Sequence, residues 1–451
     1  MDILVYIIAI PILGVLVFVH EFGHYIIAKL NGIGVDVFSI GFGKELIGFT
    51  YGETRYRLSI VPFGGYCKLR GEESKDRDDK TEKDARAWLN KPPLSRLSTS
   101  LAGPVFNYFF AVILMTCLLY FGYNATIMTG QVEVMESPSA PAMAAGLRSG
   151  DTVLSIDNKN IEKFDDILPA VMFNVNKKLE MSYLHNGVTN RTSVTPRFNT
   201  NSGAAFIGVS PLYYSCVGYV VSNSPAFKAG MRPGDRIRSV DNVRMDYYYQ
   251  FQDYMQTKSS GAVLNIDIAR AELKNPALTN NIRIKMSIPS GSAAGSLGIE
   301  LDPSQSPRYM KKIKADGLIK SFIGGVNQSD DLIVLTFKGV QAMVTGKVDA
   351  GKSMAGPIRI LQFTGTVATR AELWFLIWFM AYISIALGFA NLLPIPGLDG
   401  GHALISIGEI VSGRNLPDKA REKIEIAGVI CILLIMVFAL QNDIINIFFR
   451  K

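Results

Sequence analysis

The stretch "VHEFGHYIIA", Val19 to Ala28, interrupts an otherwise apolar segment of the chain. No charged residue occurs in the preceding run Ile3–Val19, which has the composition of a membrane-spanning helix. His20, Glu21 and His24 therefore lie at membrane depth, where ionisable side chains are costly and usually serve a function. The sequence thus predicts a membrane protein with a polar site inside its first span.

The overall composition fits a chain that is part membrane-embedded and part soluble. Of its 451 residues 48% are hydrophobic, and the mean hydropathy is +0.21. The net charge is +7, but no dense run of Lys and Arg is interleaved with aromatic residues, so we expect no nucleic-acid partner. The four cysteines are far apart and form no Cys-x-x-Cys motif, which predicts no disulfide framework.

Apolar stretches of membrane length, about 20 residues each, occur four times in the sequence. The expected spans are 1–30, 98–125, 371–400 and 425–447. Lys and Arg are concentrated in the connections 31–97 and 401–424, which predicts that both connections are cytoplasmic. The long middle region and both termini should then lie on the other side of the membrane.

The middle region contains an internal repeat. "APAMAAGLRSGDTVLSIDNKNI" from Ala140 aligns without a gap with "SPAFKAGMRPGDRIRSVDNVRM" from Ser224. Each copy has the pattern of a short helix, a Gly-Asp turn and a strand, and resembles a PDZ domain, which captures extended peptides at a sheet edge. We expect PDZ-like domains at 126–214 and 215–305. The alternative is a generic small β-domain with Gly-Asp turns.

Two further segments have distinct patterns. "VFSIGFGKELIGFTYGETRYRLSIVPFGGYCKL", residues 37–69, is rich in Gly, aromatic and β-branched residues and predicts β-hairpins. Gly64 and Gly65 within it offer a backbone edge that an extended peptide could approach closely. Residues 306–370, beginning "PRYMKKIKADG" at 307, show apolar residues and Lys at helical spacing and predict amphipathic linker helices.

His20 and His24 are spaced i, i+4, so on a helix they lie on one face and can reach one metal ion. Glu21 is offset from that face, as a general base for water would be. This is the H-E-x-x-H arrangement of zinc peptidases. A catalytic zinc site takes three protein ligands, so the sequence must supply one more.

The candidate for that ligand lies in "NLLPIPGLDGGH", Asn391 to His402, at the inner end of the third span. Pro394 and Pro396 exclude a regular helix there, and unwound backbone at membrane depth is tolerated where it lines a cavity. The topology places Asp399 at a depth similar to that of the His20 site. Asp399 could instead cap a helix N-terminus, and from the residues alone both roles remain open. His185, in the first repeat, is interpreted as a surface residue.

Together, "HEFGH" and "NLLPIPGLDGG" resemble the two motifs of the site-2 protease family of intramembrane zinc metallopeptidases. The pair of external PDZ-like units narrows the resemblance to bacterial members that cleave regulatory proteins. The resemblance covers the whole chain. The expected fold class is a polytopic α-helical membrane protein with four transmembrane helices, a cytoplasmic-side β-hairpin region and two external PDZ-like (α+β) domains.

The resemblance also implies roles for individual residues. The zinc ligands (Zn²⁺) would be His20, His24 and Asp399, and Glu21 would be the general base. His402 matches the family pattern without being an expected ligand. The expected substrate-binding residues are Asn391, Gly64, Gly65 and Pro394.

The resemblance further implies substrates and a location. Substrates would be transmembrane segments of single-pass membrane proteins, such as anti-sigma factors, and signal-peptide remnants. Peptide termini would bind the PDZ-like domains, and the lipid bilayer would surround the spans. The protein would lie in the bacterial inner membrane, with its active site near the cytoplasmic side.

Two other functions deserve comparison with proteolysis. A membrane scaffold could use PDZ-like units to bind exposed peptides, and a membrane metal carrier, or a structural metal site, could use the histidines. Neither requires both Glu21 and the Asp399 motif, so the sequence favours the protease.

Overall fold

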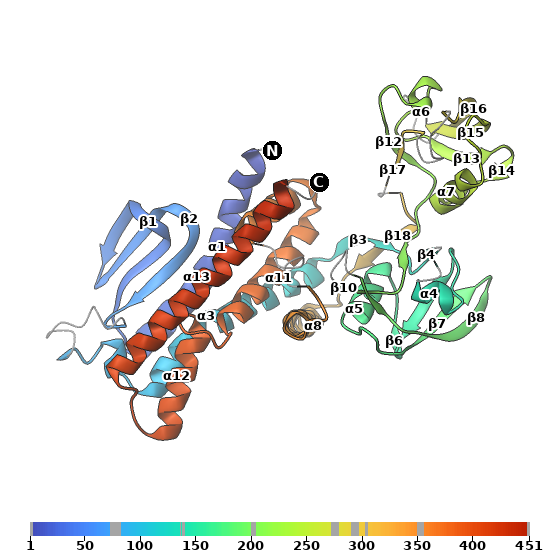
Figure 1. Ribbon diagram of the computed structural model, residues 1–451. Helices are drawn as coiled ribbons and strands as arrows, with labels where there is room; N and C mark the ends of the chain where they lie inside the picture. The colour runs from blue at the N-terminus through green and yellow to red at the C-terminus, as the bar shows by residue number, and fades with distance from the viewer. Residues whose placement is uncertain are drawn as a thin grey trace. The chain divides into compact units, whose positions relative to one another are not determined.

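The computed structural model describes residues 3–72, 83–135, 137, 140–199, 204–271, 279–289, 297–302, 305–349 and 356–448 (Figure 1). The chain divides into two compact units. One consists of Met1–Asn124 with Lys312–Lys451 and is called the helical unit below. The other, Ala125–Lys311, is called the β-rich unit.

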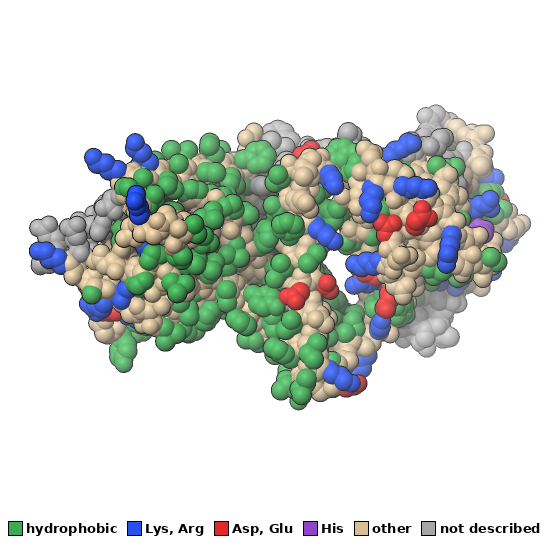
Figure 2. Space-filling view, turned by 90° about the horizontal axis from the view of Figure 1, so that it is seen from below, with side chains coloured by type: hydrophobic (Ala, Val, Ile, Leu, Met, Phe, Trp, Pro, Cys, Tyr) green, Lys and Arg blue, Asp and Glu red, His purple; other side chains and the backbone are tan. Residues whose placement is uncertain are grey.

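The part of the chain that the structure describes has four helices long and apolar enough to cross a membrane. They are α1 (Ile3–Leu30), α3 (Pro93–Phe121), α11 (Leu373–Asn391) and α13 (Asp418–Phe448). This confirms the four predicted apolar spans. Figure 2 shows apolar side chains over much of the helical unit, and on α13 Leu434 is 66% exposed. Such a surface suits contact with lipid rather than water.

Small residues allow α1, α3 and α11 to pack closely. A Cβ added to Gly23 of α1 would lie 2.6 Å from the carbonyl oxygen of Ala102 in α3. A Cβ added to Gly388 of α11 would lie 3.2 Å from the carbonyl oxygen of Pro104. Close backbone approach at small residues is typical of helices packed in membranes. It places α3 against both helices that carry the sequence motifs.

The predicted hairpin region forms a sheet of two long, bent strands, β1 (Val35–Tyr51) and β2 (Thr54–Leu69). Because both strands bend, residues 37–40 pair with 55–58 on one side, and residues 35–40 pair with 65–69 on the other. Among the described residues, no strand pairs with the outer side of 65–69. That free edge lies along α1, since a Cβ added to Gly65 would be 3.1 Å from Cγ1 of Val17 (Figure 1).

Residues 306–370, predicted to form amphipathic linker helices, differ in part from that prediction. Arg308–Ile313 forms strand β18, which pairs with β3 (Tyr123–Met128), instead of a helix. Helix α8 (Leu318–Val344) begins only after Gly317, whose φ of 86° is incompatible with a helix. The second linker helix, α10 (Pro357–Arg370), follows.

The connection 401–424, expected as a loop, is largely helical. It contains most of α12 (Asp399–Ser412) and the beginning of α13. Elsewhere in the helical unit, the short helix η2 (Trp88–Asn90) precedes α3. A buried ion-pair cluster holds α12 in place. Glu409 of α12 lies 2.7 Å from Arg96 of α3 and 2.7 Å from Arg421 of α13. Removing one partner of such a buried cluster typically costs about 3–5 kcal/mol.

The β-rich unit contains two copies of one arrangement, as the sequence repeat predicts. The first consists of β4 (Val132–Val134), α4 (Pro141–Ala144), β5 (Thr152–Ile156), β6 (Lys159–Asn160), η3 (Phe164–Asp166), α5 (Ile167–Met172), β7 (Leu179–His185), β8 (Val188–Val194), β9 (Arg197–Asn199), β10 (Ala204–Phe206) and β11 (Val209–Pro211). The second consists of β12 (Val217–Val220), α6 (Pro225–Lys228), β13 (Arg236–Val240), β14 (Val243–Arg244), α7 (Tyr248–Gln256), β15 (Val263–Ala271), β16 (Thr279–Ser287) and β17 (Ile299–Leu301). Their sheets have equivalent orders, β6-β5-β7-β8 and β14-β13-β15-β16, and each has its own apolar core.

The repeated Gly-Asp turn has the same structural role in both copies. Asp151 and Asp235 are buried, and each accepts a hydrogen bond of 2.8 Å from the backbone N–H three residues earlier. The partner of this aspartate differs between the copies. His185 lies 2.6 Å from Asp151, whereas Arg270 lies 2.7 Å from Asp235. The side chain of His185 is 32% exposed, so His185 lies at the surface as expected, with one ring nitrogen against the buried Asp151.

Candidate metal centre

Three side chains from two distant parts of the sequence converge inside the helical unit. His20 and His24 lie on one face of α1, with their Nε2 atoms 3.2 Å apart. Oδ2 of Asp399, the first residue of α12, lies 3.0 Å from Nε2 of His20 and 3.3 Å from Nε2 of His24. Among the described residues, these form the one group of three or more His, Cys, Asp or Glu side chains spaced to hold a metal ion.

The spacing of the three atoms fits a tetrahedral metal ion. Bonds of about 2.0–2.1 Å at tetrahedral angles place ligand atoms about 3.3 Å from one another. Oδ2 of Asp399 is buried and has no hydrogen-bond partner, as expected for an atom that binds a cation. The cap of α12 is Leu398, without a side-chain cap bond, so the alternative role of Asp399 as a helix cap is wrong.

The interrupted third span positions Asp399. Helix α11 ends at Asn391, and the backbone then turns through Gly397, whose φ is 90°. A Cβ on Gly400 would collide with the carbonyl oxygen of Leu392, so α12 can begin this close to the end of α11 only with glycine there. The prolines and glycines of this motif therefore bring Asp399 back beside α1.

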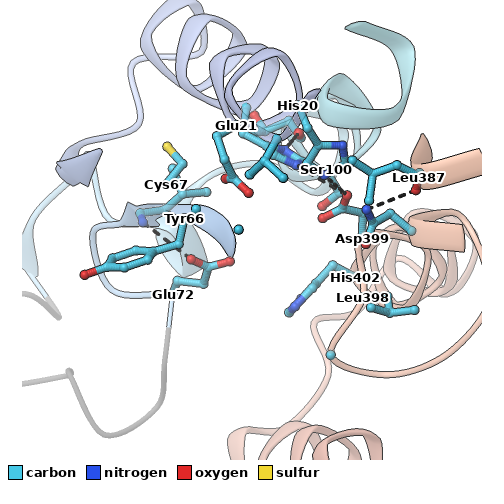
Figure 3. A pocket seen from close by; sticks show the side chains of 18 of the residues that line it. His20, Glu21, Tyr66, Cys67, Glu72, Ser100, Leu387, Leu398, Asp399 and His402 are labelled. Carbon is cyan, nitrogen blue, oxygen red and sulfur yellow. Dashed lines mark hydrogen bonds and ion pairs between the residues drawn. The ribbon is translucent and has the colours of Figure 1, made fainter. Parts of the chain in front are cut away.

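A cavity of about 360 Å³ opens beside the three side chains. In Figure 3 the carboxylates of Glu21 and Glu72 point into it from the α1 and β2 side, and His402 faces it from α12. The lining also includes Gly64, Gly65 and Asn391, which were predicted to bind substrate, and Tyr66 next to them.

Pro394 is the predicted site residue that does not line the cavity, because it is exposed in the turn between α11 and α12. His402 lines the cavity and is not one of the three converging residues, and that it is no ligand stays a prediction. Asn391 lies at the last turn of α11, and its Nδ2 donates to the carbonyl of Leu387 at 3.1 Å. Its side-chain oxygen thus remains available to a ligand in the cavity.

The free edge of β2 forms one wall of this cavity. The backbone N–H of Cys67 faces the carboxylate of Glu21, and the N–H of Leu69 lies 3.4 Å from Glu72. These two N–H groups therefore point away from β1. Burial, with the nearby Glu21 and Glu72 carboxylates, raises the pKa of the Cys67 thiol well above its usual range.

Sequence reasoning missed the contribution of α3. Nδ1 of His24 donates to the carbonyl of Thr99 at 2.8 Å, and Nδ2 of Asn107 lies 3.0 Å from Nδ1 of His20. An asparagine inside an apolar span is the signal that could have pointed to α3, because buried amides at membrane depth need a partner.

A family model and several known proteins match this chain along nearly its whole length. The model of peptidase family M50 matches residues 8–435. A protein named "Putative zinc metalloprotease" from Borreliella burgdorferi is 30% identical over 461 residues, which cover 97% of this chain and 98% of that protein. The regulator of sigma E protease of Haemophilus influenzae is 29% identical over 454 residues, covering 96% and 97%. The regulator of sigma-E protease RseP of Salmonella typhimurium is 28% identical over 445 residues, covering 96% of each.

The metal-binding capacity of the three converging residues is open to direct measurement. We expect His20→Ala and Asp399→Ala to lose most bound zinc, because each removes one of three ligands. His402→Ala, which alters the same cavity, should keep it. Elemental analysis of the purified proteins checks this, and zinc retained at wild-type level in Asp399→Ala would contradict it.

Proposed function

Because this chain is a zinc metalloprotease of peptidase family M50, we propose that its active site is the cavity between α1, β2 and α12. There it would hydrolyse peptide bonds within transmembrane segments of single-pass membrane proteins. The single observation that carries the proposal is the convergence of His20, His24 and Asp399 at ligand distances beside Glu21. Residues of three of the four apolar helices, α1, α3 and α11, line this cavity, which supports an intramembrane site.

In this proposal the three converging side chains hold the zinc ion, and Glu21 is the general base. Bound zinc polarises a peptide carbonyl and makes water more acidic. Glu21 takes a proton from the attacking water and delivers it to the amine nitrogen as the C–N bond breaks. The carboxylate of Glu21 faces the cavity.

Glu21→Gln separates proteolysis from metal binding. The amide is nearly isosteric but cannot accept the proton, so cleavage of a single-span substrate should fall by at least about 100-fold. Zinc content should stay at the wild-type level, because Glu21 is not one of the three ligands. Cleavage in proteoliposomes and zinc analysis on the same preparation measure both, and full activity in Glu21→Gln would refute the role.

The substrate is proposed to bind as an extended strand along residues 65–69 of β2. A helical peptide bond is shielded by its neighbours, so the segment must unwind before water reaches it. Unwound backbone groups need new partners in a dry site. The edge N–H groups of Cys67 and Leu69 supply some, and the side chain of Asn391 lies across the same cavity. Strand addition to a free edge is a common way to bind peptides.

Gly65→Ala tests this strand pairing. The added Cβ would lie 2.7 Å from the carbonyl oxygen of Ser39 and 3.3 Å from Cγ of Glu21, so the edge must shift next to the base. We expect kcat/KM to fall by about 10- to 100-fold, because small misplacements of a substrate have effects of this size. Gly14→Ala is the matched control, since its Cβ would meet nothing within 4 Å. Equal kinetics for the two variants would argue against pairing at this edge.

The two repeats of the β-rich unit are proposed to be PDZ domains that bind peptide termini outside the cytoplasm. Their equivalent sheet orders and the equivalent pairs β11–β4 and β17–β12 support this. The excess of Lys and Arg in the connections 31–97 and 401–424 supports a cytoplasmic side for the site. Bacterial relatives carry the name regulator of sigma E protease, which fits an inner membrane protein with a regulatory role. We propose anti-sigma factors and signal-peptide remnants as its substrates.

Deletion of residues 126–305 tests the role of the repeats in substrate choice. If they hold back substrates with intact outer domains, the deletion should raise cleavage of an intact single-span protein relative to its trimmed form. Zinc content should not change, because no ligand is removed. An unchanged preference between intact and trimmed substrate would count against this role.

A further inference from the structure

Helix α3 contacts both imidazole rings on their Nδ1 side, opposite the Nε2 atoms that face Asp399. Nδ1 of His24 lies 2.8 Å from the carbonyl oxygen of Thr99, and Nδ1 of His20 lies 3.0 Å from Nδ2 of Asn107. Thr99 and Asn107 are both 0% exposed. A helix that carries neither sequence motif therefore supports the two residues that would bind the metal.

Three residues of α3 form this support, and their spacing is that of one helix face. Thr99, Gly103 and Asn107 are separated by four residues each, so they lie one above another on α3. A Cβ on Gly103 would collide with Nε2 of His24 and would lie 2.7 Å from Nε2 of His20. Glycine at this position therefore keeps the space beside both Nε2 atoms free.

The contact with Thr99 determines which ring nitrogen of His24 carries the hydrogen. A backbone carbonyl only accepts hydrogen bonds, so Nδ1 of His24 carries the hydrogen and donates it. The lone pair of the neutral ring is then on Nε2, which faces Asp399. This is the form of histidine that binds a metal through Nε2.

His20 needs the same arrangement if its Nε2 is a ligand, and Asn107 can provide it. Amide oxygen and nitrogen have nearly the same shape, so the direction of an Asn side chain follows from its hydrogen bonds. Oδ1 of Asn107 is buried and has no partner when Nδ2 faces the ring. A half-turn of the amide brings Oδ1 to Nδ1 of His20, where it accepts the ring hydrogen.

We propose that Asn107 is a positioning residue of the metal centre, whose side-chain oxygen accepts Nδ1–H of His20 and directs Nε2 toward zinc. The inference rests on the proposed role of His20 as a zinc ligand. Helix α11 holds Asn107 in place, because the hydroxyl of Ser384 donates to the backbone carbonyl oxygen of Asn107 at 3.0 Å. Hydrogen-bond partners of this kind orient ligand histidines and raise metal affinity.

Two substitutions of Asn107 separate this role from simple packing. Asn107→Leu has a similar size but no acceptor, whereas Asn107→Asp is isosteric and accepts without donating. Ser384→Ala is the matched control, because it disturbs the α3–α11 contact without touching a histidine. The readouts are zinc affinity, by competition with a chelator, and the visible absorption of the cobalt-substituted full-length protein.

We expect Asn107→Leu to weaken zinc binding by about 10- to 100-fold and to change the cobalt absorption. Asn107→Asp and Ser384→Ala should bind zinc as the wild type does. Wild-type zinc affinity and cobalt absorption in folded Asn107→Leu would overturn the inference. If that variant does not fold, Asn107→Asp decides, because loss of zinc despite a retained acceptor also overturns it.

His20→Ala, measured in parallel, distinguishes failure of this inference from failure of the proposed ligand set. Loss of zinc in His20→Ala with no change in Asn107→Leu overturns the role of Asn107 alone. Unchanged zinc binding in His20→Ala overturns the ligand set, and the role of Asn107 with it.

Discussion

Two imidazole rings and one carboxylate at membrane depth require one another, and the arrangement of the helical unit depends on this requirement. Nε2 of His20, Nε2 of His24 and Oδ2 of Asp399 lie within 3.3 Å of one another. In an apolar span each group alone would be costly, whereas together they form the donor set of a cation site. The interruption of the third span follows from the same requirement, because Asp399 reaches α1 only if the chain turns back after Asn391.

Helix α3 links the two halves of this site. Gly23 allows α1 to approach it closely, and Gly388 does the same for α11. The same helix contacts the Nδ1 atoms of both imidazoles through Thr99 and Asn107. Its residue Arg96 also pairs with Glu409 of α12. Small residues thus set the distances between helices, while a few buried polar groups fix their rotation and depth.

Much of the site could be predicted from the sequence, for identifiable physical reasons. The i, i+4 spacing of His20 and His24 determines a shared face, and Pro394 with Pro396 determines a break in the helix. Asn107 was missed, because an asparagine in an apolar span signals a buried polar partner but the sequence does not identify that partner as His20. The strand Arg308–Ile313 was missed, because its spacing also fits an amphipathic helix and its partner β3 lies far away in the sequence. The buried pairing of His185 depends on Asp151, 34 residues earlier, which only the folded sheet brings close.

The proposed site consists of two histidines and one carboxylate that hold a zinc ion beside Glu21. X-ray absorption at the zinc edge of the purified full-length protein tests it most directly. We expect two imidazole nitrogens and carboxylate or water oxygens, all at about 2.0–2.2 Å, with no sulfur ligand. A sulfur ligand at about 2.3 Å, or a first shell with fewer than two imidazoles, would contradict it.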